Sequence, residues 1–167
     1  NREAFRNSLS DVTGVDKVSY TNNVFPGVNN TTVFKASGSE QDHIMGQYFA
    51  DYDHIEVMKL AMKEGRYFSR DFPSDSLGIV LNEAAVKEFG FTNPLGEELY
   101  YAPTKERLKV IGVVKDFNFE SFKLEVRPLS IRLTQNDNNL LVRYQGNPQA
   151  LVANIATIWK QNSNNQP

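Results

Sequence analysis

Hydrophobic and polar residues change their spacing several times along the chain, and each spacing predicts a different element. Phe5, Leu9 and Val12 recur at helical spacing and predict a helix over residues 2–12, which Gly14 can end. Alternating or short apolar segments then predict strands at residues 15–20, 31–36 and 44–49. The first part of the chain is therefore expected to hold a helix followed by strands.

The middle of the chain has shorter elements and more turn signals. We expect, in order, a helical turn at 53–58, an extended segment at 60–62, a loop at 65–73, a buried strand at 79–81, and a hairpin of strands at 98–101 and 108–115. Before this hairpin, Ala85, Val86 and Phe89 have helical spacing, with Asn82 and Gly90 at the two ends. These two residue types commonly begin and end helices, so a strand–helix–hairpin unit is predicted.

The last third of the chain returns to longer elements. Residues 129–133 alternate strictly and residues 141–144 alternate in part, while the residues between them are polar. This pattern predicts a second hairpin, with its turn at 135–139. Asn147 followed by Pro148 favours the start of a helix. The apolar residues that follow at helical spacing are Leu151, Ile155 and Ile158.

The order of these elements predicts an α+β fold rather than a regular alternation of strands and helices. The central strand–helix–hairpin unit is flanked by two segments that each hold strands and a helix. We therefore expect two lobes: residues 1–50 and 128–167 form an outer lobe, and residues 51–127 form a small inserted lobe. The expected core of the insertion consists of Phe89, Leu99, Val110, Val113 and Phe117.

Composition narrows the class of protein without identifying a reaction. The chain has 167 residues, of which 40% are hydrophobic and 23% are charged, as is typical of globular domains. Its net charge of -2 gives no reason to expect nucleic acid as a partner. The absence of cysteine excludes disulfides and thiolate chemistry. The apolar runs are far shorter than the roughly 20 residues of a membrane-spanning helix.

Candidate catalytic and metal-binding residues form no recognisable motif. His43 and His54 lack the spacing of a helical zinc motif, although acidic residues lie near them. A metal site is one interpretation, and two solvated histidines beside a strand end is the one that we favour. No serine lies in a Gly-x-Ser-x-Gly motif, and neighbouring carboxylates such as Asp51 and Asp53 are typical of solvated surface. We therefore expect no catalytic residue, no metal and no cofactor.

Gly112 and the aromatic residues that follow its strand each have more than one structural interpretation. Gly112 is a lone glycine between apolar residues, which indicates a bulge or close backbone packing rather than a phosphate-binding loop. Phe117, Phe119 and Phe122 follow as an aromatic cluster, and alternation places the first two on one face. We favour core packing for this cluster, and an exposed partner surface is the alternative.

Short motifs follow one another through the middle of the chain. They read GRYF at 65–68, IVLNEAA at 79–85, NPLG at 93–96, VIGVVKDFNFES at 110–121 and RPL at 127–129. Each motif alone is weak, but together in this order they are specific. They resemble the periplasmic core domain of MacB/FtsX-type ABC-transporter permeases, and the opening TGVDKVS at 13–19 is also similar to the start of that family's domain.

The residues that carry this resemblance are mostly of architectural types, such as turn glycines, a turn proline and the helix-capping Asn82. We therefore expect them to be mainly structural. They are Gly65, Arg66, Phe68, Asn82, Glu83, Asn93, Pro94, Gly96, Gly112, Lys115, Asp116, Phe117, Phe119, Arg127 and Pro128. One departure is Asn118, where related permeases often carry histidine, so this loop lacks a candidate titratable group.

The resemblance implies a fold, a place and a role. The fold is a MacB-like periplasmic core with a porter-like outer lobe and a sabre-like insertion. The segment is expected on the periplasmic side of a bacterial inner membrane, in a protein that extends beyond both ends of this sequence, with a further strand on either side. It is not expected to be an enzyme, because ATP hydrolysis belongs to a separate cytoplasmic domain or subunit.

The expected function is to transmit ATPase-driven conformational change and to bind partner proteins or cargo in export, lipoprotein handling or signalling. The expected partners are the ABC ATPase, a second permease copy in a dimer, and a periplasmic adaptor or lipoprotein, but not nucleic acid. The alternative is a periplasmic ligand-binding domain that recognises a peptide, a lipid or an antibiotic. Such a domain would contain a deep apolar pocket with a few convergent polar groups.

Overall fold

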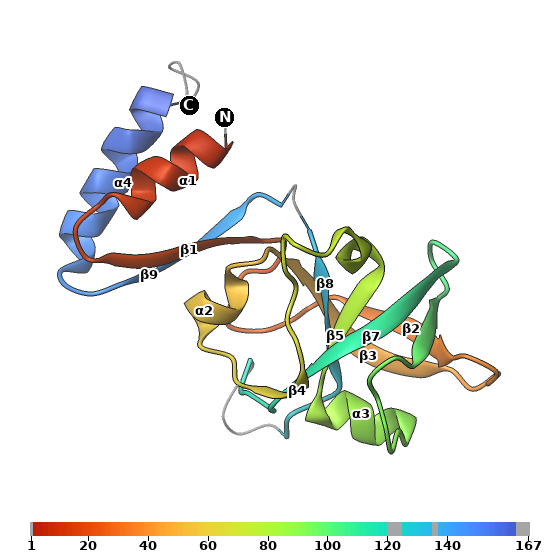
Figure 1. The fold of residues 1–167 in the computed structure, drawn as a ribbon. Coiled ribbons are helices and arrows are strands. Elements are labelled where there is room, and N and C mark those ends of the chain that lie inside the picture. Colours follow the sequence, from red (N-terminus) through yellow and green to blue (C-terminus); the bar gives the residue numbers. More distant parts are fainter. Residues whose placement is uncertain (1, 120–124, 135–136, 163–167) are drawn as a thin grey trace.

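The computed structural model of the protein describes residues 2–119, 125–134 and 137–162, and it has an α+β fold, as the sequence predicts (Figure 1). The helices are α1 (Arg2–Ser10), α2 (His54–Met58), the 3-10 helix η1 (Pro73–Leu77), α3 (Glu83–Phe89) and α4 (Pro148–Asn162). The strands are β1 (Val15–Thr21), β2 (Thr31–Ala36), β3 (His43–Ala50), β4 (Met62–Gly65), β5 (Gly78–Asn82), β6 (Glu98–Tyr101), β7 (Glu106–Val114), β8 (Leu129–Leu133) and β9 (Asn139–Tyr144).

Six strands close into a ring, which we call the barrel. Their order is β2-β6-β7-β5-β8-β3, and a further pairing of β2 with β3 completes the ring. The pairs β3–β8 and β5–β7 are parallel, and the other pairs of the ring are antiparallel. One barrel core is formed by Phe34, Met45, Ile79, Leu81, Ala85, Leu99, Leu108 and Val110. A second core packs strand residues such as Tyr48 and Ile131 against Val28, Phe68 and Phe119 from the loops.

The remaining elements form a smaller unit, which we call the terminal body: α1, β1, β9 and α4. β1 and β9 pair antiparallel along most of their length, and α1 and α4 lie side by side over them (Figure 1). The core of this body consists of Phe5, Leu9 and Val18. β1 reaches the barrel at its last residue, where Thr21 pairs with Ala50.

The strand–helix–hairpin unit predicted for the middle of the chain is confirmed, whereas β4 extends to Gly65, beyond the extended segment expected at 60–62. β6 and β7 form the expected hairpin, with Glu98 opposite Lys109. The side chain of Asn82 accepts a hydrogen bond from the Ala85 N–H at the start of α3. Gly90 ends α3 with φ of 70°, a conformation that glycine adopts without steric cost.

The hairpin predicted for residues 129–144 is wrong. β8 lies between β5 and β3 in the barrel, and β9 pairs with β1 in the terminal body. Four of the five residues of β8 are buried, so both of its faces are covered. Such burial is typical of a central strand, whereas a strand in a surface hairpin has one solvated face.

The two-lobe division of the sequence stays a prediction, and strand pairing crosses its boundaries. The barrel combines β2, β3 and β8 from the expected outer lobe with β5, β6 and β7 from the expected insertion. Of the expected core residues, Leu99, Val110 and Val113 are buried. Phe89 and Phe117 are only partly buried, each at the edge of a barrel core. In the described part of the chain, no helix has both the length and the apolar character needed to cross a membrane.

Candidate functional site

A first group of motif residues lies where β4 meets β7. Gly65 has φ of +69°, and a Cβ there would meet the Ile111 carbonyl oxygen at 2.5 Å. A Cβ on Gly112 would meet the Arg66 carbonyl oxygen at 2.1 Å. The two glycines therefore allow two backbones to approach more closely than any side chain would permit, which fits the close packing expected for Gly112.

Arg66 extends from this contact to η1. Its guanidinium donates two hydrogen bonds of 2.7 Å to the carboxylate of Asp75, which is fully buried. Burial raises the pKa of Asp75, but the hydrogen bonds from Arg66 and the Ser69 N–H more than offset this and leave it below its ordinary value. Phe68 is buried in a barrel core. In the 93–96 turn, Pro94 is buried, Asn93 is exposed, and the Gly96 N–H donates to the Val110 carbonyl.

A second group of motif residues joins α3 to β8. Asn82 is fully buried, and its Oδ1 accepts hydrogen bonds of 2.9 Å from the N–H groups of Ala85 and Leu129. Its Nδ2 donates to the Arg127 carbonyl at 3.0 Å. All three of these hydrogen bonds join the side chain of Asn82 to backbone groups. Asn82 therefore fixes the start of α3 to the start of β8.

Glu83 and Asp116 link the start of α3 to the segment that follows β7. Glu83 accepts a hydrogen bond from the Asp116 N–H, and the Asp116 carboxylate accepts one from the Ala84 N–H, each at 3.0 Å. Lys63 donates to Glu83 at 2.7 Å, and this bond with that of the Asp116 N–H lowers the pKa of Glu83 below its ordinary value. The Lys115 N–H donates to Ala61, and its side chain is exposed.

The aromatic motif residues pack inward. Phe119 is buried and Phe117 is half-buried, with ring centroids 5.5 Å apart. The Arg127 guanidinium lies 5.6 Å from the centre of the Phe119 ring and donates to the Val28 carbonyl. The Pro128 carbonyl accepts from the Gly46 N–H. Core packing is the arrangement that we favoured for this cluster; Phe122 lies outside the described residues.

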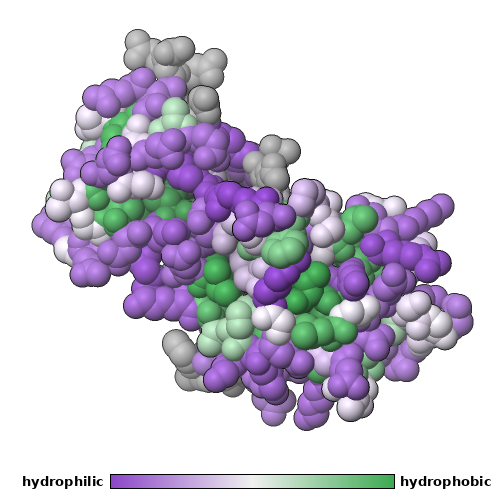
Figure 2. Space-filling view, in the orientation of Figure 1, coloured by the Kyte–Doolittle hydropathy of each residue, from purple (hydrophilic) through white to green (hydrophobic). Residues whose placement is uncertain are grey.

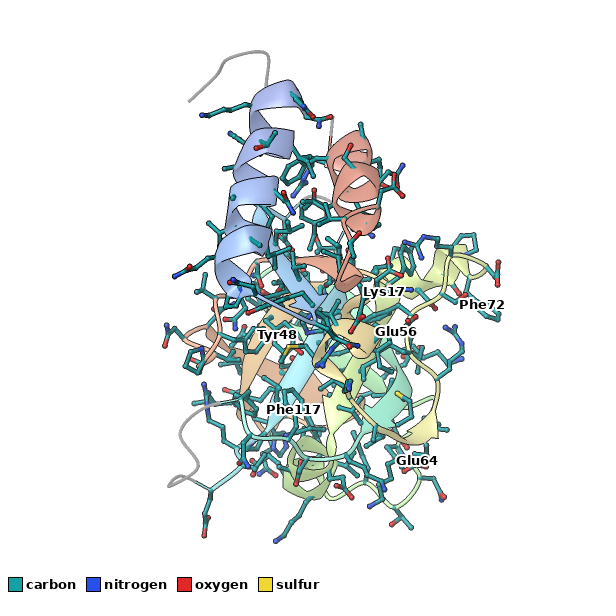
Figure 3. The ribbon with its side chains drawn as sticks, turned by 90° about the vertical axis from the view of Figure 1, so that its left-hand side faces the viewer. Lys17, Tyr48, Glu56, Glu64, Phe72 and Phe117 are labelled. Carbon is teal, nitrogen blue, oxygen red and sulfur yellow. The ribbon has the colours of Figure 1, made fainter. Side chains whose placement is uncertain are left out.

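A third cluster, which contains none of the motif residues, lies between the terminal body and the barrel. We call it the junction: residues 51–57 together with the side chains of Arg6, Lys17 and Arg70. Arg6 of α1 donates to Asp51 and, at 2.7 Å, to Asp53. Arg70 also donates to Asp53, at 2.9 Å, and this bond raises the pKa of Arg70. Lys17 of β1 forms an ion pair of 3.0 Å with Glu56 of α2 (Figure 3).

The junction also contains one of the two histidines. His54 is fully buried, with Nδ1 3.2 Å from the Ser19 hydroxyl and Nε2 3.0 Å from the Tyr48 hydroxyl. Burial lowers the pKa of His54 to about 4, so this ring is neutral at neutral pH. His43 is buried at the edge of the barrel, 3.0 Å from Glu88.

The interpretation favoured from sequence, that these side chains are solvated, is therefore wrong for His43, His54 and Asp51. Each of these side chains is buried, because a partner lies opposite it in the folded chain. The described residues contain no group of His, Asp and Glu arranged to hold a metal ion. One sequence signal points to the junction: Arg6 follows Phe5 on the inward side of α1, where an unpaired arginine would be costly.

A shallow hollow of about 270 Å³ lies at the tip of the barrel, beside the loop between β2 and β3. Its lining includes Lys35, Glu40, Glu98, Tyr100 and Arg107, which are polar and carry both signs of charge. It therefore differs from the deep apolar pocket that a ligand-binding domain would need.

Comparison with known families decides the identity. The family described as MacB-like periplasmic core domain matches residues 2–158. The chain belongs to this family. It is thus an extracytoplasmic domain of a MacB-like ABC-transporter permease, a non-catalytic part of such transporters. No curated protein sequence matches the chain significantly.

Solved structures have the same fold. The periplasmic region of MacB from Actinobacillus actinomycetemcomitans has a TM-score of 0.68 and 18% identity, over 95% of this chain and 72% of that one. The extracellular domain of the ABC-type transporter YknZ from Gram-positive bacteria has a TM-score of 0.67 and 20% identity, over 98% of this chain and 84% of that one. Both likenesses show that the chain shares the fold of these domains.

Proposed function

We propose that this domain transmits conformational change from an ABC ATPase, located elsewhere in the transporter, to partner proteins or cargo outside the cytoplasm. Its chain ends support this role. The N-terminal end of α1 and the C-terminal end of α4 lie at the same pole of the molecule (Figure 1). Movement of the membrane-embedded part would therefore act on the α1–α4 helix pair.

The observation that carries the proposal is the separation of the helix pair from the barrel. Each of the two bodies has its own apolar core, and no residue is shared between these cores. Two bodies joined by a polar contact can rotate relative to one another without exposing either core. A movement of the α1–α4 helix pair would thus change the orientation of the barrel relative to this pair.

The proposed interacting proteins are an ABC ATPase domain or subunit, a second permease copy in a dimer, and a periplasmic adaptor or lipoprotein. The proposed location is the inner membrane. The motif residues are proposed to be mainly structural, because most of their contacts run to backbone and core. The porter-like and sabre-like division at residues 50–51 and 127–128 is retained as a proposal. Nothing in the polar hollow favours the ligand-sensing alternative.

The test follows the orientation of the two bodies through the ATPase cycle. This chain contains no cysteine, so Asn154→Cys on α4 and Lys87→Cys on α3, in a transporter whose cysteines outside this chain are replaced by serine, give two defined, exposed spin-label positions. The whole permease with its ATPase is reconstituted in nanodiscs, and the label–label distance is measured without nucleotide and with ATP–vanadate. We expect the distance distribution to shift between the two states. An identical distribution in both states would remove the proposed role.

A further inference from the structure

The contact between the terminal body and the barrel is made largely by charged and polar side chains. On the face shown in Figure 2, hydrophilic residues dominate the region in which the two bodies meet. Direct bonds across it join Arg6 to Asp51, Lys17 to Glu56, and the Arg143 side chain to the Val57 carbonyl. All three of these bonds end on the short segment 51–57, so this segment, which includes the first four residues of α2, is the part of the barrel side that holds the terminal body.

Asp53 occupies the centre of this contact. Its carboxylate lies 2.7 Å from Arg6 of α1, 2.9 Å from Arg70 of the loop after β4, and 3.7 Å from Lys17 of β1. One anion thus links cations from three segments that are far apart in sequence. Its side chain is only 16% exposed, so water screens these pairs less than it screens surface pairs.

The neighbours of Asp53 restrict Arg6 further. Asp51 is 5% exposed and accepts hydrogen bonds from Arg6 and from the Tyr20 N–H. The Arg6 guanidinium also lies 4.9 Å from the centre of the Tyr20 ring. If Arg6 left this site, two carboxylates would stay partly buried without their main cation. Such a state is strongly disfavoured, which makes the bonded arrangement a defined state rather than a loose surface contact.

We propose that Asp53, with Arg6, Lys17 and Arg70, is an electrostatic latch that sets the orientation of the α1–α4 helix pair relative to the barrel. When the latch is closed, the two bodies move as one. When its charges are separated or neutralised, the apolar cores stay intact, and β1 remains hydrogen-bonded to the barrel where Thr21 pairs with Ala50. The contribution of this latch to transport rests on the proposed function, whereas the latch itself is a property of the domain alone.

The test uses the 167-residue chain with the same labels at positions 154 and 87. Asp53→Asn keeps the shape of the side chain and removes its charge. Glu83→Gln is the matched control, because it removes one negative charge from the ion pair of Glu83 with Lys63, away from the junction. We expect one narrow distance population for the unaltered chain and for Glu83→Gln, and an additional population for Asp53→Asn. Intact near-ultraviolet circular dichroism is required of each variant.

Salt supplies a second, independent measurement. Raising NaCl to about 1 M shortens the screening length to about 3 Å, which should weaken the pairs of Asp53 with the more exposed Lys17 and Arg70 and so broaden the distribution of the unaltered chain. Asp53→Asn should respond less, because its latch is already open. Amides of α2 should exchange about tenfold faster in this variant. A single narrow population for Asp53→Asn that salt does not change, or equal broadening in Glu83→Gln, would overturn the latch. A latch confirmed here with no nucleotide response in the whole transporter would instead count against the proposed function.

Discussion

The barrel and the terminal body are built from the same kinds of element but bury their apolar side chains to different extents. In the barrel, Leu81 and Leu99 have no exposed surface. In the terminal body, the apolar core has three buried side chains, Phe5, Leu9 and Val18, and the apolar neighbours packed on it, such as Ile155, are partly exposed. A closed ring surrounds a side chain from all directions, whereas a strand pair under a helix pair covers it from two. The barrel therefore holds most of the stability, and the terminal body is the part that can yield.

The largest expected effect tests this difference directly. Leu81→Ala removes a fully buried side chain from a barrel core and should lower the free energy of unfolding by about 3–5 kcal/mol. Ile155→Ala in α4 removes a partly exposed one and should cost about 1 kcal/mol. Chemical denaturation of both variants measures the two values. Equal losses would mean that the two cores are equally important.

The hydrogen bonds of Asn82 should matter almost as much as a core side chain. Asn82→Ala leaves the N–H groups of Ala85 and Leu129 without this acceptor in a buried place, and should cost about 2–3 kcal/mol. Asn93→Ala in the exposed turn is the comparison variant and should change stability by less than about 0.5 kcal/mol. If thermal denaturation showed equal losses of stability for the two variants, the barrel would not depend on the hydrogen bonds of Asn82.

A pH titration sharpens the comparison at the junction. The pKa of His54 is about 4 in the folded chain, below the ordinary value of 6.5, so the unfolded chain binds more protons between these values. Stability from this group is complete above pH 6.5 and falls as the pH decreases toward 4. Between pH 6.5 and pH 5 the loss should be about 2 kcal/mol. In His54→Gln the slope over this window should largely disappear, and an unchanged slope would assign it to other groups.

A smaller effect, apart from those of the comparison variants, concerns a side chain at the edge of the barrel. Phe89 was expected in the core, and a fully buried phenylalanine would cost about 3–5 kcal/mol when cut to alanine. Its ring is partly exposed and packs on His43 at 4.5 Å and on Phe91 at 5.0 Å. Phe89→Ala should therefore cost only about 1.5 kcal/mol. A loss as large as that of Leu81→Ala would show that α3 closes the barrel more tightly than its exposure indicates.

Sequence reasoning was most successful where the determining contacts are local. Helical spacing, the Asn82 cap and the Gly90 terminus each depend on residues within a few positions, and α3 follows from them. The hairpin of β6 and β7 is equally local, because a short turn joins two adjacent strands. The candidate site was harder: the motif residues pointed to the joints of the barrel, while Arg6 and Asp53 of the junction belong to no motif.

The sequence by itself determined the elements, the α+β class and the family, because periodicity, capping residues and short motifs act over short stretches of chain. Tertiary structure alone decided the partners of β8 and β9, since alternation fixes which face of a strand is buried but not which strand lies beside it. It also decided that Asp51 and His54 are buried. A charged or polar side chain leaves water only when a partner is brought opposite it, and here Arg6 and Ser19 come from segments more than thirty residues away.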